Sequence, residues 1–230
     1  YAFLYISDKK EGLVMTVAAT LLDGDPENNF LHRQEFADGK DHFNPEGVLD
    51  GATNIIIAGQ YAYMCTDKGL VILDIARYDA QLRPDPKVIK VLPIRTPTSV
   101  AVQFRYAFVT CADGLRVVDL TDPNDPQLVE DAVVRIADAK SVYISRTYAF
   151  VAAGDQGMAI VDIETPTKPA APSWMSGLFF NAGGAMNDTR DVKVAMTNNS
   201  MFAYVADGKN GLRIVQLTST EDTPGIYGYA

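Results

Sequence analysis

Histidine and cysteine are scarce in this 230-residue chain, which holds two of each. The sequence has no Cys-x-x-Cys-His haem site, no His-Glu-x-x-His motif and no clustered zinc-ligand spacing. It also has no Gly-x-Ser-x-Gly nucleophile elbow and no glycine-rich loop of the kind that binds phosphate. We therefore expect the chain not to be an enzyme, with no catalytic residues, no metal site and no cofactor of its own.

Long apolar runs and an excess of basic residues are missing as well. No apolar run approaches the ~20 residues of a membrane-spanning helix, so we expect no membrane span. The chain has 20 Lys and Arg against 29 Asp and Glu, a formal net charge of −9. That balance argues against nucleic acid and anionic membrane surfaces as partners. No amphipathic helical pattern of useful length is present, which leaves strands as the expected elements.

What the chain does contain is a recurring hairpin, clearest between Tyr106 and Asp119. An aromatic and β-branched run is followed by Ala112-Asp113-Gly114 and then by a second apolar run, which is the pattern of a β-hairpin. Neither run alternates between apolar and polar residues, so both faces of the sheet should be covered. Five copies of the second run begin at a glycine, namely Gly12, Gly69, Gly114, Gly157 and Gly211.

The spacing of the copies predicts the fold class. Most copies carry four strands, and a four-stranded unit every ~40–45 residues is the period of a propeller blade. We predict an all-β protein, a β-propeller of four-stranded antiparallel blades in one domain. The expected blades span residues 1–36, 52–92, 97–135, 139–175 and 189–230, with loop insertions at 37–51 and 176–188. The repeated leucine positions should be buried between blades, namely Leu13, Leu70, Leu115, Leu212 and the substitute Met158.

The third copy carries a family resemblance. Its sequence from Gly114 to Pro126, Gly-Leu-Arg-Val-Val-Asp-Leu-Thr-Asp-Pro-Asn-Asp-Pro, resembles the LVIVD repeat, a propeller repeat of bacterial and archaeal secreted or surface proteins. The resemblance covers nearly the whole chain and is strongest in the third and fourth copies. The first and fifth copies depart from it, since Val17 and Gln216 stand where the other copies have aspartate. The resemblance implies an extracellular or cell-surface location.

Small polar residues open the innermost strand of four copies: Asn54, Ser99, Ser141 and Asp191. In a propeller this strand lines the central channel, so these side chains are candidates for a polar ring at one channel mouth. The alternative is that small polar residues fit the crowded axis and form local hydrogen bonds.

The loop insertion at 37–51 is polar and acidic, with frequent Gly and Pro. Its Asp38, Asp41 and Glu46 could gather around calcium, but their spacing matches no defined calcium loop. We interpret the segment as a solvated loop.

The second insertion follows Trp174, the only tryptophan, and contains Phe179 and Phe180 on a glycine-rich frame. Such a loop either folds onto its own propeller or presents an apolar contact to a partner. The glycosylation sequons at Asn187 and Asn198 are weak signals, because a match of this kind is expected by chance.

Cys65 and Cys111 occupy equivalent strands of neighbouring copies. Their distances from the start of the strand differ by one residue, so the two sulfur atoms should point to opposite faces. We expect both to be buried thiols without a disulfide bond between them.

Three functional hypotheses follow. The first is a non-catalytic surface scaffold that binds a protein partner or a neighbouring subunit through its loops. The second is implied by the resemblance alone, because similar proteins accompany multihaem c-type cytochromes in extracellular electron transfer. Haem would then belong to the partner, with His32 or His42 as a candidate axial ligand. The third is a propeller hydrolase or lyase that acts at the channel mouth with Asp191 as base.

The first copy begins at Tyr1, in what the other copies show as the second strand. An unpaired inner edge is unfavourable in a propeller. We therefore expect the chain to be a section of a longer polypeptide that supplies at least the missing strand of the first blade. The alternative is a neighbouring subunit that closes the ring or covers the edge.

Overall fold

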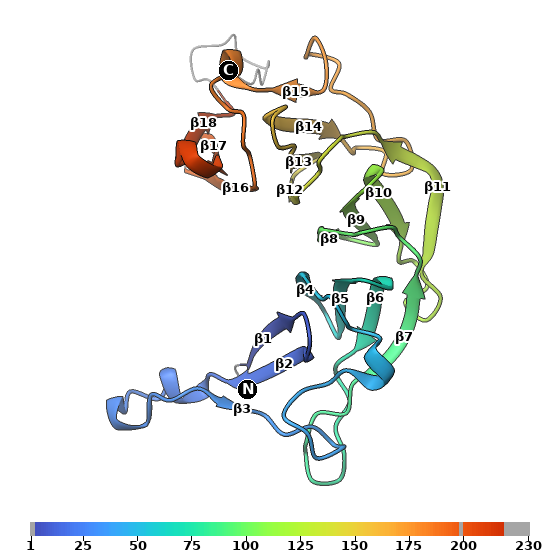
Figure 1. Cartoon of the computed structure of the whole chain (residues 1–230), viewed down its shortest axis with the longest axis vertical. Coiled ribbons are helices and arrows are strands. Elements are labelled where there is room, and N and C mark those ends of the chain that lie inside the picture. Colours follow the sequence, from blue (N-terminus) through green and yellow to red (C-terminus); the bar gives the residue numbers. More distant parts are fainter. Residues whose placement is uncertain (1–2, 198–199, 219–230) are drawn as a thin grey trace. The chain divides into compact units, whose positions relative to one another are not determined.

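The computed structural model describes residues 3–197 and 200–218, and there the regular elements are antiparallel β-strands and short 3-10 turns. These strands form five separate antiparallel sheets, the blades of a β-propeller, coloured in chain order in Figure 1. The chain divides into two compact units, Tyr1–Val100 with Asp122–Pro126, and Ala101–Thr121 with Gln127–Ala230. Among the described residues, no helix is long and apolar enough to cross a membrane.

The first unit contains the first two blades. The first blade has the order β1-β2-β3, with bounds Phe3–Asp8, Gly12–Val17 and His32–Arg33. The second has the order β4-β5-β6-β7, with bounds Asn54–Ala58, Tyr61–Thr66, Gly69–Asp74 and Lys87–Leu92. Between β2 and β3 the chain forms the 3-10 turns η1 (Ala19–Leu21) and η2 (Pro26–Asn28), and η3 (Pro45–Gly47) precedes β4.

The third blade begins at Ser99, just before the point in the sequence where the first unit ends, and the fourth and fifth blades lie wholly in the second unit. Strands β8 to β11 form the third blade (Ser99–Gln103, Tyr106–Cys111, Gly114–Asp119 and Gln127–Val134). Strands β12 to β15 form the fourth (Ser141–Ser145, Tyr148–Ala152, Met158–Asp162 and Phe179–Phe180). Strands β16 to β18 belong to the fifth (Asp191–Met196, Met201–Ala206 and Leu212–Gln216), with turns η4 (Ala182–Gly184) and η5 (Gly208–Asn210) nearby.

The structure confirms the predicted fold class and the predicted hairpin. Strand β9 pairs with β10 in register, from Gly114 opposite Cys111 to Asp119 opposite Tyr106. The expected polar opening residues Asn54, Ser99, Ser141 and Asp191 each begin the first strand of their blade. The repeat therefore encodes one antiparallel blade per copy.

A glycine recurs at the start of the third strand of the copies, and in the second and third blades its presence has a steric cause. Gly114 has a φ of +114°, and a Cβ atom there would lie 2.1 Å from the carbonyl oxygen of Val134. Gly69 is in the same position, with its added Cβ 2.1 Å from the oxygen of Leu92. A side chain would thus collide with the main chain near the end of the outer strand.

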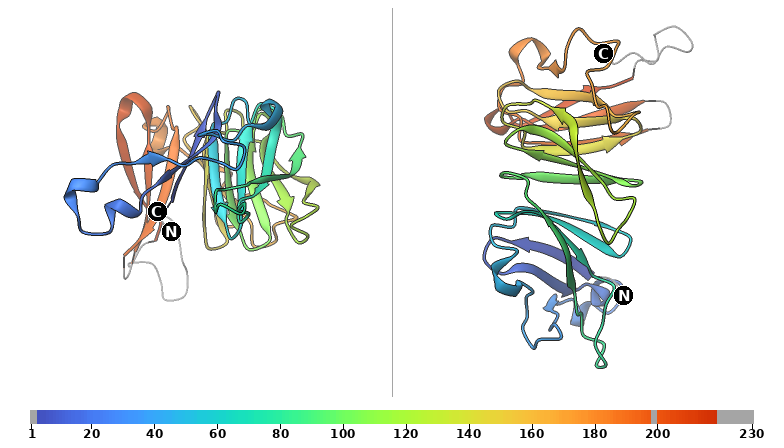
Figure 2. Two further views of the ribbon diagram at one scale, coloured as in Figure 1. Left: turned by 90° about the horizontal axis from the view of Figure 1, so that it is seen from below. Right: turned by 90° about the vertical axis from the view of Figure 1, so that its right-hand side faces the viewer.

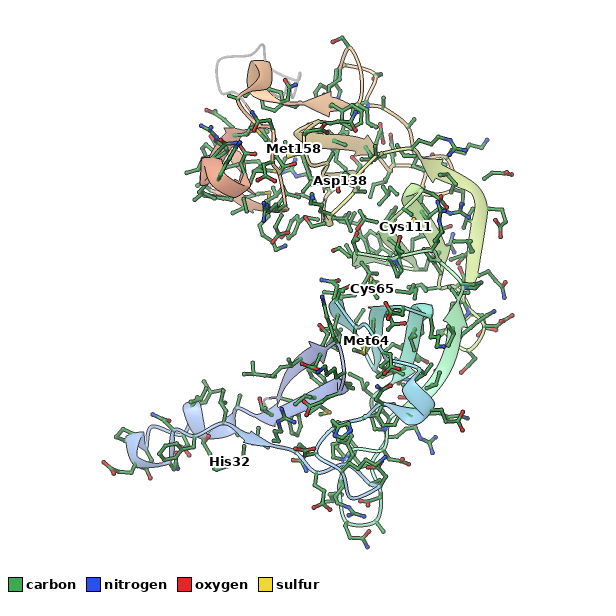
Figure 3. The ribbon with its side chains drawn as sticks, in the orientation of Figure 1. His32, Met64, Cys65, Cys111, Asp138 and Met158 are labelled. Atoms are coloured by element: carbon green, nitrogen blue, oxygen red, sulfur yellow. The ribbon has the colours of Figure 1, made fainter. Side chains whose placement is uncertain are left out.

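Blades stack face to face within each unit, as Figure 2 shows. In the first unit Leu13 and Met15 of the first blade pack with Met64 and Leu73 of the second around buried Phe36. Met64 and its neighbour Cys65 are labelled on β5 in Figure 3.

In the second unit, strand β13 contributes to two cores at once. Its Ala149 and Val151 pack with Leu115 and Val117 of the third blade. The intervening Phe150 packs instead with Val192 and other residues of the fifth blade. Because successive side chains of a strand point to opposite faces, a strand buried on both faces is apolar at every position. This packing explains the missing alternation in the sequence.

The expectation that every repeated leucine is buried fails at one position. Leu13, Leu70, Leu115 and Met158 are fully buried, but Leu212 is 63% exposed. Leu115 faces the following blade, whereas the corresponding face of the fifth blade, which also carries exposed Ile214, is uncovered by the described residues. Burial at this position therefore depends on a following blade.

Part of the segment expected as a loop insertion at 176–188 is a strand. Phe179 and Phe180 form β15, which pairs with Met158 and Ala159 of β14. Pro166, Pro169 and Pro172 precede it, and proline has no N–H to donate to a ladder. The regular outer strand of this blade consequently starts after the proline-rich segment.

Both cysteines are buried and neither is part of a disulfide bond. Burial raises the pKa of the Cys111 thiol, which lowers its reactivity.

At the start of the chain, β1 pairs with β2, and no described strand pairs with the other edge of β1. The last part of the expected fifth blade, residues 219–230, lies outside the described residues, as does Tyr1. A longer polypeptide that completes the first blade stays a prediction.

Candidate functional site

The polar residues that open the inner strands form bonds between blades. In the second unit the Ser141 hydroxyl oxygen accepts a hydrogen bond from the backbone N–H of Val192, at 3.2 Å. In the first unit the Asn54 side-chain oxygen accepts one from the backbone N–H of Val100, at 3.0 Å. Ser99 is buried. The side chain that opens one inner strand thus bonds the second residue of the next inner strand.

Asp191 is the charged member of the predicted ring, and it belongs to a small polar cluster. Its carboxylate accepts a hydrogen bond from the Lys193 ammonium group at 2.9 Å. The same ammonium nitrogen lies 5.9 Å from the ring centre of Tyr143. Burial opposes ionisation of Asp191, but hydrogen bonds from Lys193 and Ser141 outweigh burial and lower its pKa. The carboxylate is therefore ionised and held by neighbours, which suits a structural ion pair better than a proton acceptor.

The aromatic loop after the fourth blade is partly docked on its own blade. The Trp174 indole N–H donates a hydrogen bond to the Tyr148 hydroxyl oxygen at 3.2 Å. The two rings meet edge to face, with centres 6.0 Å apart. Phe180 packs against the core of the fourth and fifth blades, while Trp174 and Phe179 are 38% and 36% exposed. The loop therefore packs partly on its blade and partly presents aromatic surface.

A groove of about 280 Å³ lies beside this loop, between the fourth and fifth blades, and it exposes polar as well as apolar surface. Buried Met158 and Ile160 of β14 form part of its lining, and Met158 is labelled in Figure 3. Trp174 and Phe179 line it from the loop, and Val215 lines it from β18. The groove thus combines a rigid strand surface with exposed aromatic side chains.

The acidic loop at 37–51 is tied down by ion pairs. Asp38 pairs with Lys40 at 3.4 Å, and Asp41 pairs with Arg33 at 3.2 Å. In the part of the chain that the structure describes, no three His, Cys, Asp or Glu side chains are placed to hold a metal ion. Asp38 and Asp41 thus form ion pairs with nearby basic side chains.

The two histidines and Asn187 of the first sequon lie on the surface. His32 is exposed on β3, and a ring nitrogen of His42 lies 3.0 Å from an oxygen of Asp41. Asn187 is exposed, but the Thr189 hydroxyl of its sequon is buried and donates to backbone oxygens of Gly154 and Gly157. The second sequon begins at Asn198, outside the described residues.

One surface residue was missed at the sequence level. Phe104 is 94% exposed and has a φ of +53°, in the turn between β8 and β9. Aligning the copies places Gly59 and Arg146 at the same turn position, with φ values of +61° and +55°. A bulky aromatic residue aligned with a turn glycine was the signal available in the sequence.

Comparison with known proteins identifies the repeat. A family model described as the LVIVD repeat matches residues 51–77, 95–132, 136–175 and 188–218, together more than half of the chain. A search of curated proteins finds no match.

Solved structures with the same fold are distant in sequence. A Bacteroides uniformis protein, provisionally named a 6-phosphogluconolactonase, is 13% identical with a TM-score of 0.63, over 96% of this chain and 65% of that one. The present chain thus spans just under two thirds of that protein's length. Apo AztD from Citrobacter koseri is 14% identical with a TM-score of 0.49, over 100% of this chain and 59% of that one. At 13% identity the similarity to the Bacteroides uniformis protein shows the fold alone.

Proposed function

We propose that this chain, which belongs to the LVIVD-repeat family, is a non-catalytic protein-interaction module that holds an apolar side chain of a protein partner in the groove beside Trp174. The observation that carries the proposal is the pairing of that groove with two aromatic side chains, Trp174 and Phe179, each more than a third exposed. Aromatic side chains of this kind dominate the energy of protein interfaces.

The size and lining of the groove favour an amino-acid side chain as its occupant. Small-molecule sites usually enclose about 300–1,000 Å³ and add several convergent polar groups. The groove, at about 280 Å³, is lined mainly by apolar side chains, so it suits one or two large apolar side chains. Two methionines, Met158 and Met175, are in its lining, and methionine adapts its shape to different partners.

Trp174 is held in place before any partner arrives. Its hydrogen bond to Tyr148 and the edge-to-face contact between their rings restrict the indole. An ordered aromatic side chain loses little freedom on binding, which improves affinity. The family resemblance supports an extracellular or cell-surface setting for this interaction.

The single tryptophan provides a direct test. Peptides selected from a random library on the full chain would be titrated while Trp174 fluorescence is recorded. We expect peptides anchored by a large apolar residue to change that fluorescence, because Trp174 lines the groove. Phe179→Ser should weaken their binding about tenfold or more. Leu212→Ser, at a more exposed apolar site outside the groove, is the control and should leave affinity within about twofold.

Two outcomes would reject the proposal. One is selected peptides that bind without altering Trp174 fluorescence and equally well to the Phe179→Ser variant. The other is a large fall in melting temperature for Phe179→Ser, which would show that this ring is part of the blade's core rather than a binding surface.

A further inference from the structure

The turn between β8 and β9 places Phe104 in a conformation that side chains rarely adopt. Its φ of +53° lies in the left-handed region, which glycine adopts without steric cost and in which bulky residues are outliers. The side chain is 94% exposed, so burial in the fold does not compensate for that conformation. Gly59 occupies the corresponding turn of the second blade. Strained residues of this kind concentrate at functional sites.

Neighbouring turns extend this feature into a surface. The Gln103 side-chain N–H donates to the backbone oxygen of Arg146 at 2.9 Å, which joins the turns of the third and fourth blades. An Arg146 guanidinium nitrogen lies 3.9 Å from the sulfur of Met196, at the end of β16. Met196 is 61% exposed. We define the turn patch as Phe104, Arg105, Arg146 and Met196, all within the second unit.

The turn patch is basic although the chain as a whole is acidic. Arg105 and Arg146 are both exposed, and neither forms an ion pair with the described residues. Arg105 lies over the ring of Tyr106, 5.7 Å from its centre, and is close enough to Asp119 to interact with its charge. Two arginines beside an exposed aromatic ring and a methionine match the composition of protein interfaces, which are enriched in these residues.

We propose that the turn patch binds an acidic segment of a partner protein, with an apolar side chain of that segment against Phe104 and Met196. Charge complementarity selects this occupant, because carboxylates would pair with Arg105 and Arg146. A long polyanion such as nucleic acid is disfavoured, since the remainder of a chain with a net charge of −9 would repel it. This surface uses none of the residues that line the groove beside Trp174.

A synthetic peptide of glutamates interrupted by one phenylalanine and one leucine is a suitable probe, with a lysine-for-glutamate version as control. Binding of fluorescein-labelled peptide to the full chain would be followed by fluorescence anisotropy. We expect the acidic peptide to bind more tightly than the basic one, and to lose affinity as salt rises, because exposed charges are screened. Arg146→Gln should weaken binding about tenfold.

Phe104→Gly separates a binding role from a structural one. Glycine is free to adopt the left-handed turn, so the variant should melt at a higher temperature and yet bind the acidic peptide about tenfold less tightly. Phe179→Ser, in the other surface, should bind this peptide unchanged. The proposal is overturned if the basic peptide binds as well as the acidic one. It is also overturned if Phe104→Gly keeps full affinity or lowers the melting temperature.

Discussion

The hydroxyl oxygen of Ser141, at the start of β12, accepts a hydrogen bond from the backbone N–H of Val192, at the second position of β16. The bond crosses from the fourth blade to the fifth. Asn54 and Val100 form the same bond between the second and third inner strands. Asn54 and Ser141 thus have the same role at the same repeat position. Each side chain joins its inner strand to the next inner strand.

Removing that hydroxyl should weaken the contact between blades. Ser141→Ala should lower the free energy of unfolding by about 1 kcal/mol, the net worth of a typical buried hydrogen bond. The loss should be no larger, because the Val192 N–H also donates to Asp191. Urea denaturation measures the change, with exposed Ser173→Ala as control. Equal stabilities of the two variants would contradict the assigned role.

The repeated leucine position offers a matched pair of substitutions. Leu115→Ala should cost about 2–5 kcal/mol, since it empties a fully buried site between two blades. Leu212→Ala should cost less than about 1 kcal/mol, because Leu212 is mostly exposed. Chemical denaturation of both variants gives the comparison. Similar losses would mean that the fifth blade is covered in solution by something outside the described residues.

A buried carboxylate makes the second unit sensitive to acid. Asp207 is fully buried and accepts hydrogen bonds from the Asp188 backbone N–H at 2.8 Å, the Asn210 amide at 3.0 Å and the Arg213 guanidinium at 3.4 Å. Burial alone would raise its pKa, but these hydrogen bonds outweigh burial and lower it. A lowered folded-state pKa stabilises the fold above the unfolded-state value of about 3.9, and the gain disappears as pH falls through the folded-state pKa.

Asp207→Asn removes this one titration and leaves the other carboxylates in place. At neutral pH the variant should be less stable by about 1–3 kcal/mol, because charged hydrogen bonds are lost. The difference from the unmodified chain should shrink as the pH is lowered from about 4 to about 2. Thermal melts across that range test the expectation. A difference that does not change with pH would show that Asp207 titrates alike in the folded and unfolded states.

Alanine substitutions at two glycines with positive φ distinguish the cost of a strained backbone from the cost of a steric clash. Gly183 has a φ of +66° and no atom within 4 Å of an added Cβ, so Gly183→Ala should cost about 1–2 kcal/mol from the left-handed backbone alone. Gly114→Ala adds a clash at 2.1 Å with the main-chain oxygen of Val134 and should cost distinctly more. Denaturant midpoints of the two variants provide the measurement. Equal costs would mean that the third blade relaxes around the new methyl group.

The sequence by itself determined the fold class, the strand order within each blade and the burial of most repeated positions. The reason is local, because the glycine that opens β10 and the apolar residues of β9 specify the same hairpin in each copy. The same reasoning identified Asn54 and Ser141 as special positions, but their chemistry could not be assigned. A small polar residue at the start of a strand is compatible with both a channel site and a bond between strands.

Only the tertiary structure decided which side chains meet across blades. Leu115 is buried and Leu212 is exposed because different surroundings pack on each face. Both are leucines at the same repeat position, so the sequence alone does not distinguish their burial. The groove beside Trp174 and the turn patch around Phe104 both arise where residues of different blades converge. Their geometry depends on distances between blades, and a one-dimensional repeat contains no such distances.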